Sequence, residues 1–139
     1  MKRIGLLNAP LSHAVASLGH TQALAIADAG LPIPHGPARI DLAVTPGLPS
    51  FLQTLDAVAG EMMVERAVIA AEMAAANPSL RALLVARVDR MAAAQGRPIA
   101  LEEVPHEEFK RLTAAAVAVV RTGECSPYAN ILLHSGVTF

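Results

Sequence analysis

Short apolar runs and segments of helical periodicity alternate along the whole chain. Runs of about four to eight apolar residues bounded by Gly, Pro, Asn or Asp are typical of buried strands, and apolar positions spaced three or four residues apart are typical of helices with one buried face. The predicted strands are 23–27, 39–44, 64–71, 98–104, 117–120 and 131–135. The predicted helices are about 9–18, 49–62, 78–94 and 106–116.

Helix-capping residues support several of these boundaries. Asn8 is placed to cap the first helix, with Pro10 in its first turn and Gly19 just past its end. Asn77 precedes a first-turn proline and is predicted to cap the long helix that Gly96 ends. The alternation of strands and helices predicts an α/β fold, which we expect to be a Rossmann-like three-layer sandwich, with a mostly parallel sheet and helices on both faces.

Composition limits the size of the fold and the class of partner. A length of 139 residues fits one domain spanning 1–139. Apolar residues make up 53% of the chain and aromatic residues only 3%, so Ala, Val, Leu and Ile must form the core. So high an apolar fraction on a short chain predicts exposed apolar patches, and such patches favour a homo-oligomer.

Charge and targeting signals exclude other classes. The formal net charge is −1, with Lys and Arg scattered and few aromatic residues to stack on bases, so nucleic acid is not an expected partner. We find no signal-peptide pattern in residues 1–20 and no apolar stretch long enough to cross a bilayer. The single cysteine, Cys125, fits a reducing compartment. We therefore expect a cytoplasmic protein with no membrane partner.

Three ionisable residues are candidates for chemistry. Asp28 and His106 follow predicted strands, and ligands of open α/β sheets bind beyond the carboxyl ends of strands. His20 precedes the strand that ends at Asp28, so one subunit is not expected to unite all three, and a neighbouring chain could bring His20 to the others. Structural roles remain open: His20 could bond helix-terminal carbonyls, Asp28 could form an Asx-turn, and His106 could simply begin an acid-rich helix.

The loop before the last strand carries further candidates. Tyr128 and Asn130 offer hydrogen-bond donors and acceptors, although Tyr128 could equally be a core residue. Cys125 could be a nucleophile only with a histidine in reach. The five histidines share no paired spacing typical of a metal site, and no glycine-rich phosphate loop or dinucleotide motif is present. We therefore predict neither a metal nor a cofactor.

Several segments in order resemble the D-ribose pyranase and fucose mutarotase family over essentially the whole chain. They are LLN at 6–8, SLGHT at 17–21, DAGLPIP at 28–34, RIDL at 39–42, GLPSF at 47–51, VPHEEF at 104–109, RTGE at 121–124 and GVTF at 136–139. The run after Asp28 is similar to the ribose branch of this family and differs from the fucose branch.

The resemblance implies an isomerase that interconverts β-pyranose and β-furanose D-ribose by acid/base-assisted ring opening and closing and thereby supplies ribokinase in ribose catabolism. It further implies a homo-oligomer, a decamer of two stacked pentameric rings with sites between subunits. By matching positions, His20 would be the proton donor, and Asp28, His106 and the segment Tyr128, Ala129 and Asn130 would bind the sugar.

One residue departs from the family pattern, and other readings remain open. Gln22 stands where the family tends to carry an aspartate after Gly-His-Thr, which affects the expected rate or pH optimum if that acid tunes His20. The alternatives are a mutarotase for another sugar such as fucose, a non-catalytic sugar-binding or transport-associated protein, and a structural oligomer without a ligand.

Overall fold

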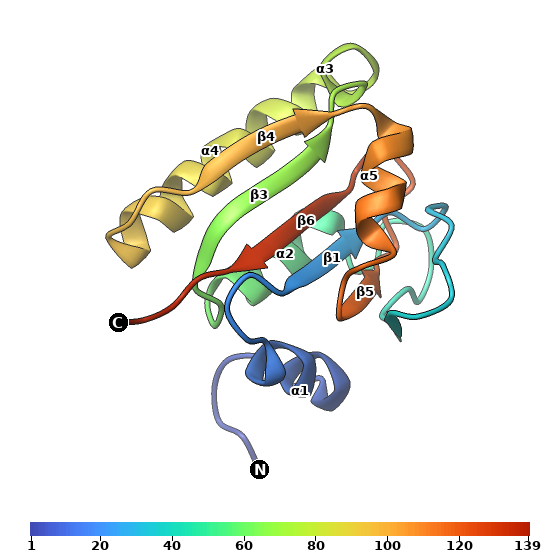
Figure 1. Cartoon of the computed structure of the whole chain (residues 1–139). Coiled ribbons are helices and arrows are strands. Elements are labelled where there is room, and N and C mark those ends of the chain that lie inside the picture. Colours follow the sequence, from blue (N-terminus) through green and yellow to red (C-terminus); the bar gives the residue numbers. More distant parts are fainter.

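A six-stranded sheet runs through the computed structural model, which describes residues 1–139 (Figure 1). The strand order is β2-β5-β1-β6-β3-β4. The strands are β1 (Ala23–Ala27), β2 (Ala38–Asp41), β3 (Val64–Ala70), β4 (Ala100–Val104), β5 (Ala118–Arg121) and β6 (Ile131–Ser135). The helices are α1 (Ala9–Ser17), α2 (Phe51–Ala59), α3 (Met73–Ala76), α4 (Pro78–Gln95) and α5 (His106–Thr113).

The sheet is mostly parallel, as predicted. The pairs β2–β5, β5–β1 and β3–β4 are parallel, and only β6 runs antiparallel to its neighbours β1 and β3. The ends of β1 and β4 and the start of β6 therefore share one edge of the sheet. The starts of β1 and β3 and the end of β6 share the opposite edge.

Helices cover both faces of the sheet, which confirms the predicted three-layer α/β fold. In Figure 1, α2 and α4 lie behind the sheet and α5 lies in front of it. The larger core lies between the sheet and α1, α2 and α4, and the smaller one lies under α5. None of the helices combines the length and apolar character needed to cross a bilayer.

The sequence of β1 explains how the short helix α5 approaches the sheet. Every residue of β1 is buried, and its alanines at alternate positions belong to the core under α5. Small side chains at Ala23, Ala25 and Ala27 leave room for Phe109 of α5, which is fully buried. This packing fixes α5, and therefore His106 at its first turn, over the centre of the sheet.

The predicted capping positions are confirmed, although one of them lacks a side-chain capping bond. Asn8 accepts a hydrogen bond from Leu11 N at 2.9 Å, and Gly96 ends α4 in the left-handed conformation with φ 70°. Asn77 stands at the N-cap position of α4, but its side chain makes no capping bond because it donates instead to the loop before β6. The short helix α3 was not predicted, because a single turn carries no periodicity.

Several predicted boundaries extend too far. The predicted strand 39–44 ends at Asp41, because Ala43 N bonds to the Asp41 carboxylate and the chain then turns towards Leu48. The predicted helix 106–116 ends at Thr113, where a turn leads into β5. The turn after β2 lies at the edge of the sheet that holds Asp28, because Asp41 pairs with Arg121 at the end of β5, whereas the turn after α5 lies at the opposite edge, where Val117 N donates to Ala23 O.

Candidate functional site

Asp28 and Asn130 are paired at the edge of the sheet where β1 ends and β6 begins. The Asn130 amide Nδ2 donates to Asp28 Oδ2 at 2.7 Å, and Asp28 N donates to Asn130 Oδ1 at 2.9 Å. The other Asp28 oxygen accepts from Gly30 N at 2.9 Å, which is the Asx-turn considered from the sequence. Asn130 is completely buried and Asp28 is half-buried, so the carboxylate has a fixed orientation at the protein surface.

His106 and Tyr128 lie against each other at the same edge. Their ring centroids are 5.0 Å apart in an edge-to-face arrangement at 84°. The next helical turn places Phe109 parallel to His106, with centroids 6.4 Å apart. His106 Nδ1 is buried and has no hydrogen-bond partner. A buried ring nitrogen without a partner is unusual in a folded protein and calls for an explanation, of which a bound ligand is one.

Glu72 holds the start of α5 and thereby the position of His106. Both carboxylate oxygens of Glu72 accept from His106 N, at 3.0 and 2.9 Å. This hydrogen bond lowers the pKa of Glu72 below its ordinary value. Glu107 and Glu108 occupy the first turn of α5, as the sequence indicated. His106 therefore both begins a helix and faces Tyr128.

The loop before β6 is tied to its neighbours by side chains distant in sequence. Asn77 Nδ2 donates to Ser126 Oγ and to Pro127 O, each at 3.0 Å. Tyr128 has a left-handed backbone with φ 57°, and the loop bends tightly there because Asn130 N donates to Tyr128 O at 2.8 Å. These contacts hold the loop in place, and Ala129 within it is fully buried.

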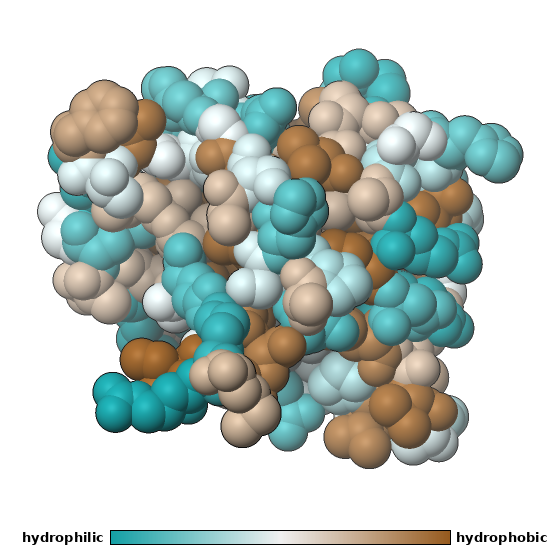
Figure 2. All heavy atoms as spheres, turned by 90° about the horizontal axis from the view of Figure 1, so that it is seen from below, coloured by the Kyte–Doolittle hydropathy of each residue, from teal (hydrophilic) through white to brown (hydrophobic).

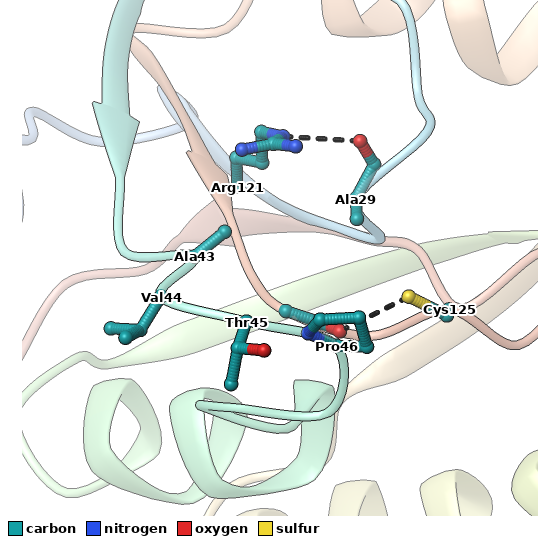
Figure 3. A pocket seen from close by; sticks show the side chains of 8 residues that line it. Ala29, Ala43, Val44, Thr45, Pro46, Arg121 and Cys125 are labelled. Atoms are coloured by element: carbon teal, nitrogen blue, oxygen red, sulfur yellow. Dashed lines mark hydrogen bonds between the residues drawn. The ribbon is translucent and has the colours of Figure 1, made fainter.

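Figure 3 shows a pocket lined by Ala29, the residue after Asp28, and by Arg121, which supports the Ala29 backbone. Arg121 Nε donates to Ala29 O at 3.0 Å, and its Nη1 donates to both oxygens of Asp41 at 3.1 Å. The backbone N–H of Ala43, followed by Arg121, holds the pKa of Asp41 below its ordinary value. A second pocket, lined by residues 28–30 and 124–127, shares Ala29 and Cys125 with the first.

Cys125 does not have the partner that a nucleophile needs. Its Sγ donates to Gly123 O at 3.4 Å, and this is the side chain's hydrogen bond in the structure (Figure 3). The thiol is exposed and contacts no histidine by hydrogen bond. No group of three or more His, Cys, Asp or Glu side chains lies close enough to share a metal ion.

His20 lies at the opposite end of β1 from Asp28. Five strand residues separate the two ends, a span of about 16 Å at the usual rise of a strand. The His20 side chain is 54% exposed, and its Nε2 lies 2.9 Å from Glu65 Oε2 at the start of β3. The structure therefore brings Asp28, His106, Tyr128 and Asn130 to one edge and leaves His20 at the other, as expected for a single subunit.

His20 does not bond the carbonyls at the end of α1, so the helix-terminal role considered from the sequence is wrong. It stands instead in a tight turn formed by Gly19 to Gln22. Gln22 N donates to Gly19 O at 3.2 Å, and the Gln22 side chain accepts from Gly19 N at 2.7 Å. Gln22 therefore stabilises the turn, and the carboxylate beside His20 comes from Glu65.

Sequence reasoning missed three supporting residues: Glu65, Glu72 and the side chain of Asn77. Each acts on a residue between 34 and 50 positions away in the chain. A lone acid or amide in a helix or strand has no local pattern that separates it from an ordinary surface residue. Only a contact map could have identified these pairs before the structure.

Comparison with known proteins agrees with the resemblance seen in the sequence. The model of the RbsD / FucU transport protein family matches residues 1–138. Two curated relatives named D-ribose pyranase, from Haemophilus influenzae and Actinobacillus succinogenes, are 55% and 54% identical to this chain, with full coverage of both chains in each comparison.

Solved structures confirm the fold. Bacillus subtilis RbsD, solved in complex with D-ribose, has a TM-score of 0.88 and 46% identity, with full coverage of both chains. A fucose mutarotase from Streptococcus pneumoniae, solved with L-fucose, has a TM-score of 0.64 at 22% identity over 94% of each chain, and this likeness supports the fold alone. With a family model spanning residues 1–138 and relatives similar from end to end, the chain belongs to the RbsD / FucU transport protein family.

Proposed function

We propose that this chain interconverts the β-pyranose and β-furanose forms of D-ribose. The observation that carries the proposal is the fixed polar cluster of Asp28, Asn130, His106 and Tyr128 at one edge of the sheet, in a chain 55% identical to a D-ribose pyranase. The Bacillus subtilis relative, 46% identical, was solved with D-ribose, which supports the same ligand here.

The reaction breaks and re-forms a single C–O bond, and the assistance it needs from the protein is proton transfer. Ring opening takes a proton from the anomeric hydroxyl, forms the C1 carbonyl, breaks the bond between C1 and the ring oxygen, and gives that oxygen a proton. Ring closure onto a different hydroxyl reverses these steps. General acid and base groups accelerate such steps by about 10²–10⁴-fold, which suits a reaction that already proceeds slowly in water.

The polar cluster is suited to hold the sugar hydroxyls. Asp28 accepts hydrogen bonds from hydroxyls, and its orientation is fixed by Asn130 and Gly30 N. His106 Nδ1 has an unused hydrogen-bonding position, and the Tyr128 ring beside it offers an apolar surface and a hydroxyl. The Tyr128, Ala129 and Asn130 segment therefore supplies one wall of the binding site.

His20 is proposed as the proton donor, and it reaches the sugar from a second copy of the chain. Its distance from Asp28 within one subunit, about the length of β1, is too long for one ribose to contact both. Large apolar side chains are exposed at several places: Met1, Ile4, Leu7, Val44, Leu48, Leu83 and Phe139. Figure 2 shows one face of the molecule, on which apolar side chains lie exposed among polar ones. Such surface supports a homo-oligomer, proposed here as a decamer of two pentameric rings acting in the cytoplasm.

The decisive experiment is NMR saturation transfer between the anomeric protons of β-pyranose and β-furanose D-ribose at equilibrium. The intact protein is expected to accelerate the exchange above the protein-free rate, and His20→Ala protein is expected to lose the acceleration. L-fucose serves as the comparison sugar. Exchange no faster than in the protein-free sample, despite binding of ribose, would leave a sugar-binding protein and remove the proposed activity.

A further inference from the structure

We propose that Glu65 is a positioning residue that assigns the two ring nitrogens of His20 to different tasks. Glu65 holds Nε2–H, and Nδ1 is the nitrogen that exchanges a proton with the sugar. This inference rests on the proposed function, because it concerns how His20 acts in that reaction. The inference adds Glu65 to the proposed site and assigns a separate role to each ring nitrogen of His20.

The contact between the two side chains fixes the tautomer. Glu65 Oε2 lies 2.9 Å from His20 Nε2, which is a normal hydrogen-bond distance. An ionised carboxylate only accepts hydrogen bonds, so Nε2 must carry the proton. No other group of the chain bonds the ring, and Nδ1 is left free on an exposed side chain. Glu65 thus leaves Nδ1 as the nitrogen that can take up and release a proton.

The backbone at His20 is held as firmly as its ring. Thr21 has a left-handed backbone with φ 67°, which is unusual for a β-branched residue and gives the third position of a type II-like turn. Ser135 bonds the turn twice: its Oγ donates to Gly19 O at 2.7 Å, and its carbonyl accepts from Thr21 N at 2.9 Å.

A second ring supports the same turn. His134 Nδ1 lies 3.1 Å from Thr21 O, and its Nε2 lies 3.4 Å from Arg66 Nη1. Since guanidinium only donates, Nε2 of His134 accepts and its Nδ1 donates to Thr21 O. An exposed side chain is ordinarily free to choose among rotamers, but His20 is constrained at both its backbone and its ring. Constraint of this kind at an exposed histidine favours a positioned chemical group over a solvated surface residue.

The assignment gives a balanced proton cycle. Protonated His20 gives the Nδ1 proton to the ring oxygen as the bond to C1 breaks, and solvent water takes the anomeric proton. When a different hydroxyl closes onto C1, its proton returns to Nδ1 and the carbonyl oxygen regains a proton from water. Nε2–H stays with Glu65 throughout, so the ring keeps its orientation in both protonation states.

The experiment compares Glu65→Gln, Glu65→Ala and a matched control, Asp56→Asn. The glutamine oxygen still accepts from Nε2–H, whereas alanine removes the acceptor. Asp56 is a similarly exposed carboxylate that accepts from Arg87 Nε at 3.0 Å and belongs to α2. Each protein is measured in two ways: the ribose exchange rate by saturation transfer over a range of pH, and the ¹⁵N shifts of His20, which report which nitrogen carries the proton.

The expected result separates the three variants. The wild type shows neutral His20 with its proton on Nε2, and Glu65→Gln keeps this tautomer and most of the rate. Glu65→Ala gives mixed tautomers and an exchange rate lower by about tenfold to a hundredfold at unchanged KM, because the ring is no longer aligned. Asp56→Asn leaves both the exchange rate and the His20 tautomer unchanged.

Two outcomes would overturn the inference, and they differ from failure of the function itself. A proton on Nδ1 in the neutral wild-type ring contradicts the assignment, as does a Glu65→Ala protein with wild-type rate and tautomer. In both cases wild-type exchange persists and the proposed function stands. If the wild type fails to accelerate exchange, the function and the role of Nδ1 fall together, whatever the tautomer.

Discussion

Asp28 is held from two sides by a side chain that is far from it in the sequence. Asn130 lies 102 residues after Asp28 in the chain. Its amide donates to the Asp28 carboxylate, and its carbonyl oxygen accepts from the Asp28 backbone N–H. In the proposed function, a carboxylate oriented in this way binds a sugar hydroxyl without first losing side-chain freedom, so we expect the two residues to act as one unit. The same logic of fixed polar groups applies at His20, where turn and ring are both constrained.

Replacement of Asn130 by alanine is expected to damage both stability and activity. Loss of the amide leaves the Asp28 backbone N–H without its partner and should lower the free energy of unfolding by about 1–3 kcal/mol. Urea denaturation measures the stability and saturation transfer the rate. Asn8→Ala is the control, because it removes an N-cap worth about 1 kcal/mol far from the cluster. Equal exchange rates in the two variants would contradict a role for Asn130 in holding Asp28.

Thr21→Gly tests the strain in the turn that carries His20. Glycine adopts φ 67° freely, whereas a β-branched residue is strained there, so the folded state should gain about 1 kcal/mol before the entropy of the unfolded glycine offsets part of it. We expect a melting temperature equal to or above that of the wild type. Thr21→Val keeps the β-branch and should not exceed the wild type. A clear drop for glycine alone would show that the turn is not strained.

At the scale of elements, the helix α5 carries His106 to its place. Phe109 buries the helix against the alanines of β1, and Glu72 binds the backbone N–H at its start. The Phe109 contact sets how closely the helix packs on the sheet, and the Glu72 contact fixes the position of its first turn. A helix of eight residues has little stability of its own, so both contacts with the rest of the fold matter.

Acid is expected to weaken this anchor. Because the bond from His106 N lowers the pKa of Glu72 in the folded state, the unfolded chain binds more protons, and stability rises with pH. The stabilisation by ionised Glu72 is fully present above its ordinary pKa of 4.5, and it is lost as the pH falls through its lower pKa in the folded state. Urea midpoints measured from about pH 3 to about pH 7 should fall on the acid side, and less steeply in Glu72→Gln. Identical slopes in both proteins would contradict this anchor.

Gly123 permits the close approach of the turn at residues 44–48 to the end of β5. A Cβ at Gly123 would lie 2.5 Å from Leu48 O and 2.6 Å from Thr45 O, which are backbone atoms that cannot move aside cheaply. Gly123→Ala should therefore lower the free energy of unfolding by about 1–3 kcal/mol. Gly60→Ala is the control, since its Cβ would meet only ordinary contacts. Similar unfolding midpoints for both would show that the turn adapts.

At the scale of the whole molecule, the sheet places the two halves of the proposed chemistry at opposite edges. His20 and Glu65 lie where β1 and β3 begin, and Asp28 and Asn130 lie where β1 ends and β6 begins. Under the proposed function, a complete site therefore requires two copies of the chain, each contributing one edge. The proposal therefore makes assembly a condition for activity.

Mixing two inactive variants tests the shared site. His20→Ala and Asp28→Ala proteins are each expected to lack ribose exchange. After dissociation and reassembly together, about a quarter of the sites should unite an intact His20 with an intact Asp28, because each site draws one edge from each of two subunits at random. Saturation transfer measures the recovered rate. A mixture as inactive as its components would place both residues in one subunit's site or remove one from the reaction.

The sequence by itself determined the elements and much of the candidate site. Apolar runs predicted all six strands, and β1 and β6 have the predicted bounds, because burial of consecutive residues is encoded locally. Asp28 and His106 were predicted from their places after strands, and Tyr128 and Asn130 as hydrogen-bonding residues on a loop; the structure brings all four to one edge. The resemblance to the family was also carried by short ordered segments of the sequence alone.

The tertiary structure decided which distant side chains meet. The antiparallel insertion of β6 between β1 and β3 sets Asn130 against Asp28, and the order of strands sets Glu65 against His20. Neither pairing has a local signal, because packing of the two sheet faces selects strand order and local propensity does not. The sequence predicted that His20 stands apart from Asp28, whereas its carboxylate partner became visible only once the sheet was assembled.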